Sequence, residues 1–232
     1  MILSILRPYF APYPGYLYRM LRSDRVVILD RVQFPRGATW ITRNRFKNDQ
    51  GEFWLSIPVW KKHLGLQRID RVRICREGRW MEKYPQSLER AYADAPYLPE
   101  HRSWLRRLFA EKFEYLLDLN LAVLQYLTAG FGIRTPLVRQ SDLNTEESGD
   151  RLLVEICRRL GAGSLLVPRE VRKYLAPGPF DDANIHLQFV SPPPPVYPQL
   201  WGDFIANLSA FDLLLNCGPK SLEMLVRGRA GE

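Results

Sequence analysis

The sequence predicts an α/β fold: a three-layer, Rossmann-like sandwich around a mostly parallel sheet, with a basic β-hairpin insertion at about residues 35–60 and a helical segment at about 79–130. The main observation is that short apolar runs, typical of buried strands, alternate along the chain with stretches of helical spacing. In addition, 232 residues with 46% hydrophobic side chains suit one large domain spanning residues 1–232.

A βαβ unit is predicted at the start of the chain. Apolar runs at 1–6 and 26–29 predict two strands, and residues 16–22 between them have helical spacing. Such a connection makes the strands parallel, and parallel sheets bind ligands beyond the carboxyl ends of their strands. We therefore expect the Pro-rich loop 8–15 and residues 30–34 to lie at the same edge of the sheet.

The hairpin insertion is predicted from two strand patterns, 40–45 and 53–59, which are separated by the turn residues Asn-Asp-Gln-Gly. Alternation in the first strand directs Arg43 and Arg45 to one face. A third alternating segment, 69–74, also predicts a strand.

The rest of the chain alternates helices with short strands. Residues 79–128 are expected to be mostly helical, with stops at Pro85, Pro96 and Pro99, and 103–127 to cover one sheet face. Thr145 is expected to cap a later helix that Gly161 ends. The remaining predicted elements are a strand within 131–138, helix 144–160, strands 164–167 and 187–190, and helix 200–215.

Positive charge is concentrated in the first third of the chain. Residues 1–80 carry 16 Lys and Arg against 6 Asp and Glu, whereas residues 81–232 carry 17 against 19. The resulting field attracts anions: a phosphate, a nucleotide or nucleotide-sugar, or a nucleic acid such as tRNA. Arg supplies 26 of the 33 basic residues, and arginine binds phosphate and carboxylate with two hydrogen bonds.

Metal, cofactor and membrane chemistry have no sequence signal. The three cysteines and three histidines lie far apart, so we predict no metal site and no cofactor. The odd cysteine count fits reduced thiols in a cytoplasmic protein. No apolar run approaches the roughly 18 to 20 residues of a membrane span, and the opening segment reads as a buried strand instead of a signal peptide.

Candidate binding residues gather in the loop after the first strand, which combines prolines with aromatic rings. A rigid loop of this kind can hold rings and a glycine against a flat ligand such as a sugar or base. Alternatively, the rings simply pack beneath the hairpin. The candidates are Pro8, Tyr9, Tyr13, Gly15 and Tyr16.

Asp30 and Gln33 follow the second predicted strand. In nucleotide-binding folds an acid at this point contacts ribose hydroxyls, although aspartate is equally common there as a turn former. The chain has no GxGxxG after its first strand and no GxxxxGK[ST], which argues against dinucleotide and P-loop sites.

The Arg43-Asn44-Arg45 segment is a further polar candidate. It forms a phosphate or oxyanion clamp if its face is concave. Asp212 and Asn216 lie four residues apart on an apolar helix, where a buried aspartate needs a partner. Arg43 or Arg151 can supply one, so a structural and a catalytic role both stay open.

Motifs spread along the chain resemble those of the WbqC-like family, which is found beside surface-polysaccharide and O-antigen genes. The family's (H/Q)-P-x-F-x-P-W-x-G-Y opening is matched by Pro8, Phe10, Pro12, Gly15 and Tyr16. The other matching segments are D-x-V-Q-F at 30–34, R-N-R at 43–45, W-L-x-I-P-V at 54–59, and two longer patterns within 151–162 and 197–218. Departures from the family pattern are Arg7, Tyr13 and Val167-Pro168, and a change of substrate or activity is expected if they touch ligand.

The resemblance implies a biosynthetic transferase in lipopolysaccharide or related glycan and metabolite assembly. Acyl or aminoacyl (glycyl) transfer to a sugar or small amine is the implied reaction. In that reading Arg43 and Arg45 bind phosphate or a developing oxyanion, and Asp30 or Asp212 orients the amine or takes its proton.

Two other classes of function remain open. An RNA-engaging protein that uses charged tRNA as donor predicts an exposed basic stripe with interleaved aromatic residues. A non-catalytic partner in a biosynthetic complex predicts an exposed apolar patch and no closed pocket.

Overall fold

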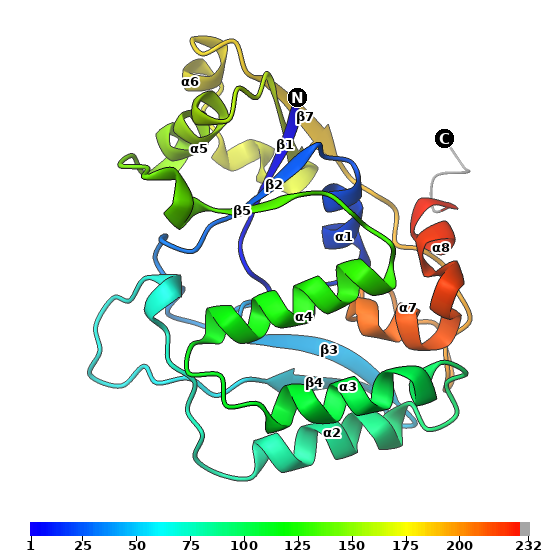
Figure 1. The fold of residues 1–232 in the computed structure, drawn as a ribbon. Coiled ribbons are helices and arrows are strands. Elements are labelled where there is room, and N and C mark those ends of the chain that lie inside the picture. The colour runs from blue at the N-terminus through cyan, green and yellow to red at the C-terminus, as the bar shows by residue number, and fades with distance from the viewer. Residues whose placement is uncertain (228–232) are drawn as a thin grey trace.

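A computed structural model describes residues 1–227, and its main sheet has five parallel strands, which lie in the upper half of Figure 1. Its strand order is β5-β2-β1-β6-β7, and every neighbouring pair is parallel. The strands are β1 Ile2–Leu6, β2 Arg25–Ile28, β5 Leu137–Arg139, β6 Ser164–Pro168 and β7 His186–Val190. The predicted α/β class and parallel sheet are therefore confirmed.

Both faces of the sheet are covered, which explains why its strands read as continuous apolar runs. Val26 and Ile28 of β2 face a large cluster shared with α1, α4, α7 and α8, whereas Val27 faces a second cluster shared with α5 and α6. The helices are α1 Pro14–Leu21, α2 Trp80–Ala91, α3 Leu98–Ala110, α4 Leu116–Gly130, α5 Gly149–Arg159, α6 Gly178–Asp181, α7 Ala210–Cys217 and α8 Ser221–Arg227. Short 3-10 helices are η1 Ile69–Arg71, η2 Gln140–Leu143, η3 Arg169–Tyr174 and η4 Gly218–Lys220.

The direction in which strands are added reverses at β1. The chain proceeds outward from β1 through β2 to β5, and then returns to place β6 and β7 on the other side of β1. The loops that follow β1 and β6 therefore leave the carboxyl ends of these two strands in opposite directions. In open parallel sheets this switch point is where ligands bind.

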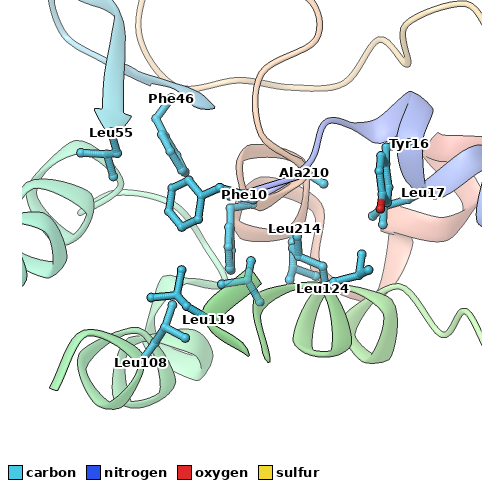
Figure 2. Close-up of a cluster of buried hydrophobic side chains, with 14 of the residues drawn as sticks. Phe10, Tyr16, Leu17, Phe46, Leu55, Leu108, Leu119, Leu124, Ala210 and Leu214 are labelled. Atoms are coloured by element: carbon cyan, nitrogen blue, oxygen red, sulfur yellow. The ribbon is translucent and has the colours of Figure 1, made fainter. Parts of the chain in front are cut away.

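The predicted hairpin insertion is a separate two-stranded antiparallel sheet, β3 Arg43–Asn48 and β4 Gly51–Ser56. Its inner face carries Phe46 and Leu55 into the large cluster. Figure 2 shows Phe10, from the loop after β1, between Phe46 and the leucines of α4. The hairpin thus packs on the sheet through that loop.

Several element boundaries predicted from the sequence are wrong. Residues 69–74 form η1 and single bridges instead of a strand, because Ile69 and Val72 both turn into the core. Pro85 lies inside α2, whose packing against α3 outweighs the lost hydrogen bond. The helix predicted at 144–160 begins only at Gly149, after Ser148, so Thr145 is no cap.

The last predicted helix, 200–215, begins at Ala210. Residues before it cross the outer face of the hairpin, where their carbonyl groups bind basic side chains. Asp203 accepts from Lys47 Nζ at 2.6 Å, and Asn207 accepts from Arg45 at 3.1 Å. Ser209 then caps α7 by accepting a hydrogen bond from the backbone N–H of Phe211.

Two buried asparagines hold the loop after β1 in place. The side-chain amide of Asn44 donates to the carbonyl oxygens of Phe10, at 3.1 Å, and Ala11, at 2.6 Å. The amide of Asn120 on α4 donates to Pro8 and Ile41, each at 2.8 Å. Ala11 has a left-handed φ of 43°, which is unfavourable for a residue with a Cβ. The asparagines therefore stabilise a loop conformation that the chain does not favour alone.

We expect Asn44→Ala to lower the free energy of unfolding by about 2–4 kcal/mol, because two buried carbonyl groups lose their donor. Urea denaturation measures the change. Asn48→Ala is the matched control on the same strand, since the Asn48 side chain only accepts an exposed hydrogen bond from Gln50. Equal losses in both variants would contradict this role for Asn44.

Candidate ligand-binding site

A cavity of about 330 Å³ opens at the carboxyl ends of β1, β6 and β7, at the switch point of the sheet. Its size lies at the lower end of the range for small-molecule sites. Its walls come from the loop and helix after β1, the hairpin, and the segments after β6 and β7. The lining residues are Tyr13, Gly15, Arg19, Trp40, Arg45, Pro168, Glu170, Val190, Ser191, Pro192 and Asn207.

Tyr13 and Gly15 form the wall nearest β1. A Cβ atom on Gly15 would lie 2.6 Å from Cε2 of Tyr13, so only glycine allows the ring to lie against the start of α1. Burial raises the pKa of Tyr13, an effect that the nearby Arg19 guanidinium opposes. Tyr13 therefore remains a neutral phenol that can donate a hydrogen bond into the cavity.

Arg19 is the most unusual residue of the cavity, because it is only 8% exposed and has no ion-pair partner among residues 1–227. Its Nε is buried without a hydrogen-bond partner, and its guanidinium lies 5.7 Å from the ring centroid of Tyr16. A buried charge without a counter-charge is unfavourable in a folded protein. An anion in the cavity would remove that penalty.

Arg45 contributes a second guanidinium from the hairpin. Nη1 binds Glu52 at 2.9 Å, and Nη2 binds the carbonyl groups of Ala206 and Asn207. Its Nε, like that of Arg19, is buried without a partner. Because the other nitrogens are occupied, Arg45 is held rigidly at the cavity wall.

Two partly exposed tryptophans form an aromatic surface at the mouth of the cavity. Trp40 lines the cavity and packs on Trp54, with ring centroids 5.5 Å apart. Arg43 stacks on Trp54 at 4.3 Å and does not line the cavity. This arginine therefore orients the aromatic pair.

The two predicted catalytic aspartates lie elsewhere. Asp30 is fully buried, and its carboxylate accepts from the backbone N–H and hydroxyl of Ser141 and from Arg139 Nε. These bonds tie the end of β2 to β5 and η2. Asp30 does not line the switch-point cavity.

Asp212 belongs to a buried polar network behind the hairpin. The hydroxyl groups of Tyr92 and Tyr197 each donate to its carboxylate at 2.8 Å, and the backbone N–H of Lys47 donates to the Tyr92 hydroxyl. Burial raises the pKa of Asp212, while the hydrogen bonds from both tyrosines and the Lys47 charge lower it. Asn216, predicted with Asp212, donates to the Asp212 backbone carbonyl instead of binding a ligand in the cavity.

The other predicted residues divide between scaffold and surface. Buried Pro8 and Asn44 belong to the loop contacts described above, and the Tyr16 hydroxyl donates to the Arg7 carbonyl. Tyr9 packs on Tyr16 with centroids 5.5 Å apart. Gln33 lines a second cavity of about 510 Å³ together with Arg7, and Arg151 lines a shallow surface depression on α5. Of the predicted site residues, the switch-point cavity brings together Tyr13, Gly15 and Arg45.

Arg19, Glu170 and Ser191 line the cavity but were not expected from the sequence. Arg19 had a signal: it lies three residues after Tyr16, on the buried face of an otherwise aromatic and apolar helix. Glu170 supplies the cavity's one carboxylate among the described residues. Of the family departures, Tyr13 and Pro168 lie at the cavity, which Val167 does not line.

Within residues 1–227, no group of three or more His, Cys, Asp or Glu side chains is arranged to hold a metal ion. The same part of the chain contains no helix that is both long and apolar enough to span a membrane.

The sheet topology and the cavity at its switch point define an α/β protein of the Rossmann-like class. The chain belongs to the WbqC-like protein family, whose model matches residues 7–224. It is 28% identical to the uncharacterized protein Rv1507c of Mycobacterium tuberculosis (strain ATCC 25618 / H37Rv) over 225 residues, which cover 96% of each chain. No solved structure matches the chain.

Replacing Arg19 by methionine is expected to leave the free energy of unfolding within about 1 kcal/mol of wild type, since an unpaired buried charge is removed. Arg139→Met is the control: it leaves buried Asp30 without its ion-pair partner and should cost about 1–3 kcal/mol. Urea denaturation compares the two. A larger loss for Arg19→Met would show that Arg19 has a stabilising partner in the folded protein.

Asp212→Asn is expected to remove a specific part of the pH dependence of stability. The folded-state pKa of Asp212 is above its ordinary value of 3.8, so the native state binds more protons than the unfolded state between the two values. Wild type therefore loses stability relative to the variant as pH rises from about 4 through the folded pKa. Urea denaturation in steps between pH 4 and 8 measures this, and a constant difference would contradict it.

Proposed function

We propose that this protein is a biosynthetic transferase that binds an anionic small molecule, a phosphate-bearing nucleotide or nucleotide-sugar, in the switch-point cavity. The observation that carries the proposal is Arg19, which is buried, has no ion-pair partner in residues 1–227, and has its Nε unpartnered at the cavity wall. An arginine in such a position is costly unless an anion binds to it. Arg45 lines the same cavity and, although paired with Glu52, has its Nε without a hydrogen-bond partner.

The aromatic surface formed by Trp40 and Trp54 supports a ligand with a ring. A base stacked on an exposed tryptophan gains about 1–3 kcal/mol. Because Trp40 also lines the cavity, one ligand can place its phosphate at Arg19 and its ring on Trp40. Tyr13 would donate a hydrogen bond to the same ligand.

The transfer itself would use Glu170, the carboxylate of the cavity. In acyl or aminoacyl transfer, an acceptor amine attacks the donor carbonyl, a C–N bond forms, and the donor's leaving group departs with its electron pair. Glu170 would take the proton that the amine loses. Arg19 would stabilise negative charge on the donor carbonyl oxygen or on a phosphate leaving group.

Calorimetry with pyrophosphate, nucleoside diphosphates and nucleotide-sugars tests the proposal. We expect saturable binding that Arg19→Met weakens at least tenfold, since charged hydrogen bonds are each worth about 1.5–3 kcal/mol. Trp40→Leu should weaken nucleotides by about fivefold or more while leaving pyrophosphate unchanged.

Arg151→Met is the matched control, because Arg151 is exposed on α5 and does not line the cavity. It should leave binding unchanged. Equal effects of Arg19→Met and Arg151→Met would show that the anion binds through general surface charge, and the cavity would lose its assigned role.

A further inference from the structure

The segment between β4 and η1 extends away from the body of the molecule, at the left of Figure 1. Residues 60–66 are all exposed, and three of them are large and apolar: Trp60 is 42% exposed, Leu64 50% and Leu66 58%. We call residues 60–68 the apolar-basic loop. Exposed leucines on a soluble surface are ordinary when scattered, but three large apolar side chains within seven residues form a patch.

The apolar-basic loop has a defined shape. His63 and Gly65 both adopt left-handed φ values, 63° and 61°, which fold the tip into a tight turn. Lys61 lies 5.0 Å over the Phe34 ring and donates to the carbonyl of Gly37. The backbone N–H of Phe34 donates to Gln67, and the Gln67 side chain donates to Trp60. The leucines are therefore held at the tip, where no other described part of the chain covers them.

The sequence on both sides of the tip is basic, while the depression that Trp60 lines holds Glu77 and Glu114 beside Arg73, Arg76 and Lys112. No Asp or Glu occurs in residues 31–48 or 53–69. Arg36, Lys61 and Lys62 are exposed there and form no ion pair within residues 1–227, whereas Arg68 pairs with Asp70. Positive charge next to a protruding apolar tip matches the surface of an anionic lipid bilayer, which presents negative head groups above hydrocarbon.

We propose that the apolar-basic loop binds anionic membrane surfaces, with Leu64 and Leu66 entering the acyl region, Trp60 at the interface, and Lys61 and Lys62 at the head groups. Tryptophan favours that interfacial depth. Each basic side chain near an anionic leaflet is attracted to it. A nucleic acid would bind the lysines but has no apolar surface for the two leucines. A lipid bilayer would contact both kinds of side chain, so we favour lipid as the partner. The proposal does not depend on the ligand of the switch-point cavity.

Co-sedimentation of the full chain with vesicles tests it. One set of vesicles is pure phosphatidylcholine, and in the other a third of the lipid is phosphatidylglycerol. We expect binding to the anionic vesicles alone, weakened by salt and reduced about fivefold or more in Leu64→Ser/Leu66→Ser. Lys61→Gln/Lys62→Gln should also reduce it. Val196→Ser, which removes an exposed apolar side chain elsewhere, should not.

Circular dichroism melting verifies that the loop variants fold, as expected for side chains that are half exposed or more. Absence of wild-type binding to anionic vesicles would overturn the proposal, as would equal binding by wild type and Leu64→Ser/Leu66→Ser. Binding to bulk tRNA that requires the lysines, without vesicle binding, would instead identify a nucleic-acid surface.

Discussion

The amide group of Asn44 is the contact on which the rest of the structure depends. It binds two consecutive carbonyl groups of the loop after β1 and so joins the hairpin to the parallel sheet. From α4, Asn120 donates to the carbonyl of Pro8 in the same loop and to that of Ile41 before the hairpin, and the N-terminus of α7 donates to Pro12. Because each prolyl residue of this loop lacks an N–H, the loop cannot build a regular hydrogen-bond pattern, and its carbonyl groups need side-chain donors. Phe10 can then fill the space between the hairpin and α4 (Figure 2).

The loop after β1 also fixes the position of the residues that line the cavity. Once Pro8 to Pro12 are held, α1 starts at Pro14, Gly15 lies against Tyr13, and Arg19 reaches the switch point from the last turn of α1. The hairpin, attached through Asn44, brings Trp40 and Arg45 to the other wall. Stability and the proposed binding therefore rely on different residues: buried asparagines hold the walls, and Arg19 carries a buried charge that has no ion-pair partner within residues 1–227. This separation is typical of sites in which binding residues reduce stability.

The sequence alone predicts the architecture well and the site only in part. Continuous apolar runs and helical spacing are local signals, so the parallel sheet, the hairpin and the helical segment were all predictable. The sequence pattern predicts a helix over residues 200–209, because nothing local reveals that Lys47 and Arg45 bind their carbonyl groups. It predicts a ligand-binding role for Asn44 for the same reason, since the partners of Asn44 lie 33 and 34 residues away. Tyr13, Gly15 and Arg45 do line the cavity, because the sequence pattern predicts the loop and the strand that carry them; their role in binding stays a prediction.

The R-N-R segment illustrates why a motif does not translate directly into a site. Strand alternation directs its middle residue inward, where Asn44 binds the loop, and its two arginines outward. The two arginines have different partners: Arg45 binds the carbonyl groups of residues 206–207 beside the cavity, and Arg43 stacks on Trp54. One segment thus supplies a scaffold contact, a cavity wall and a support for the aromatic surface. Spacing within the motif is set by the pleat of β3, and the identity of each residue is set by what lies across from it.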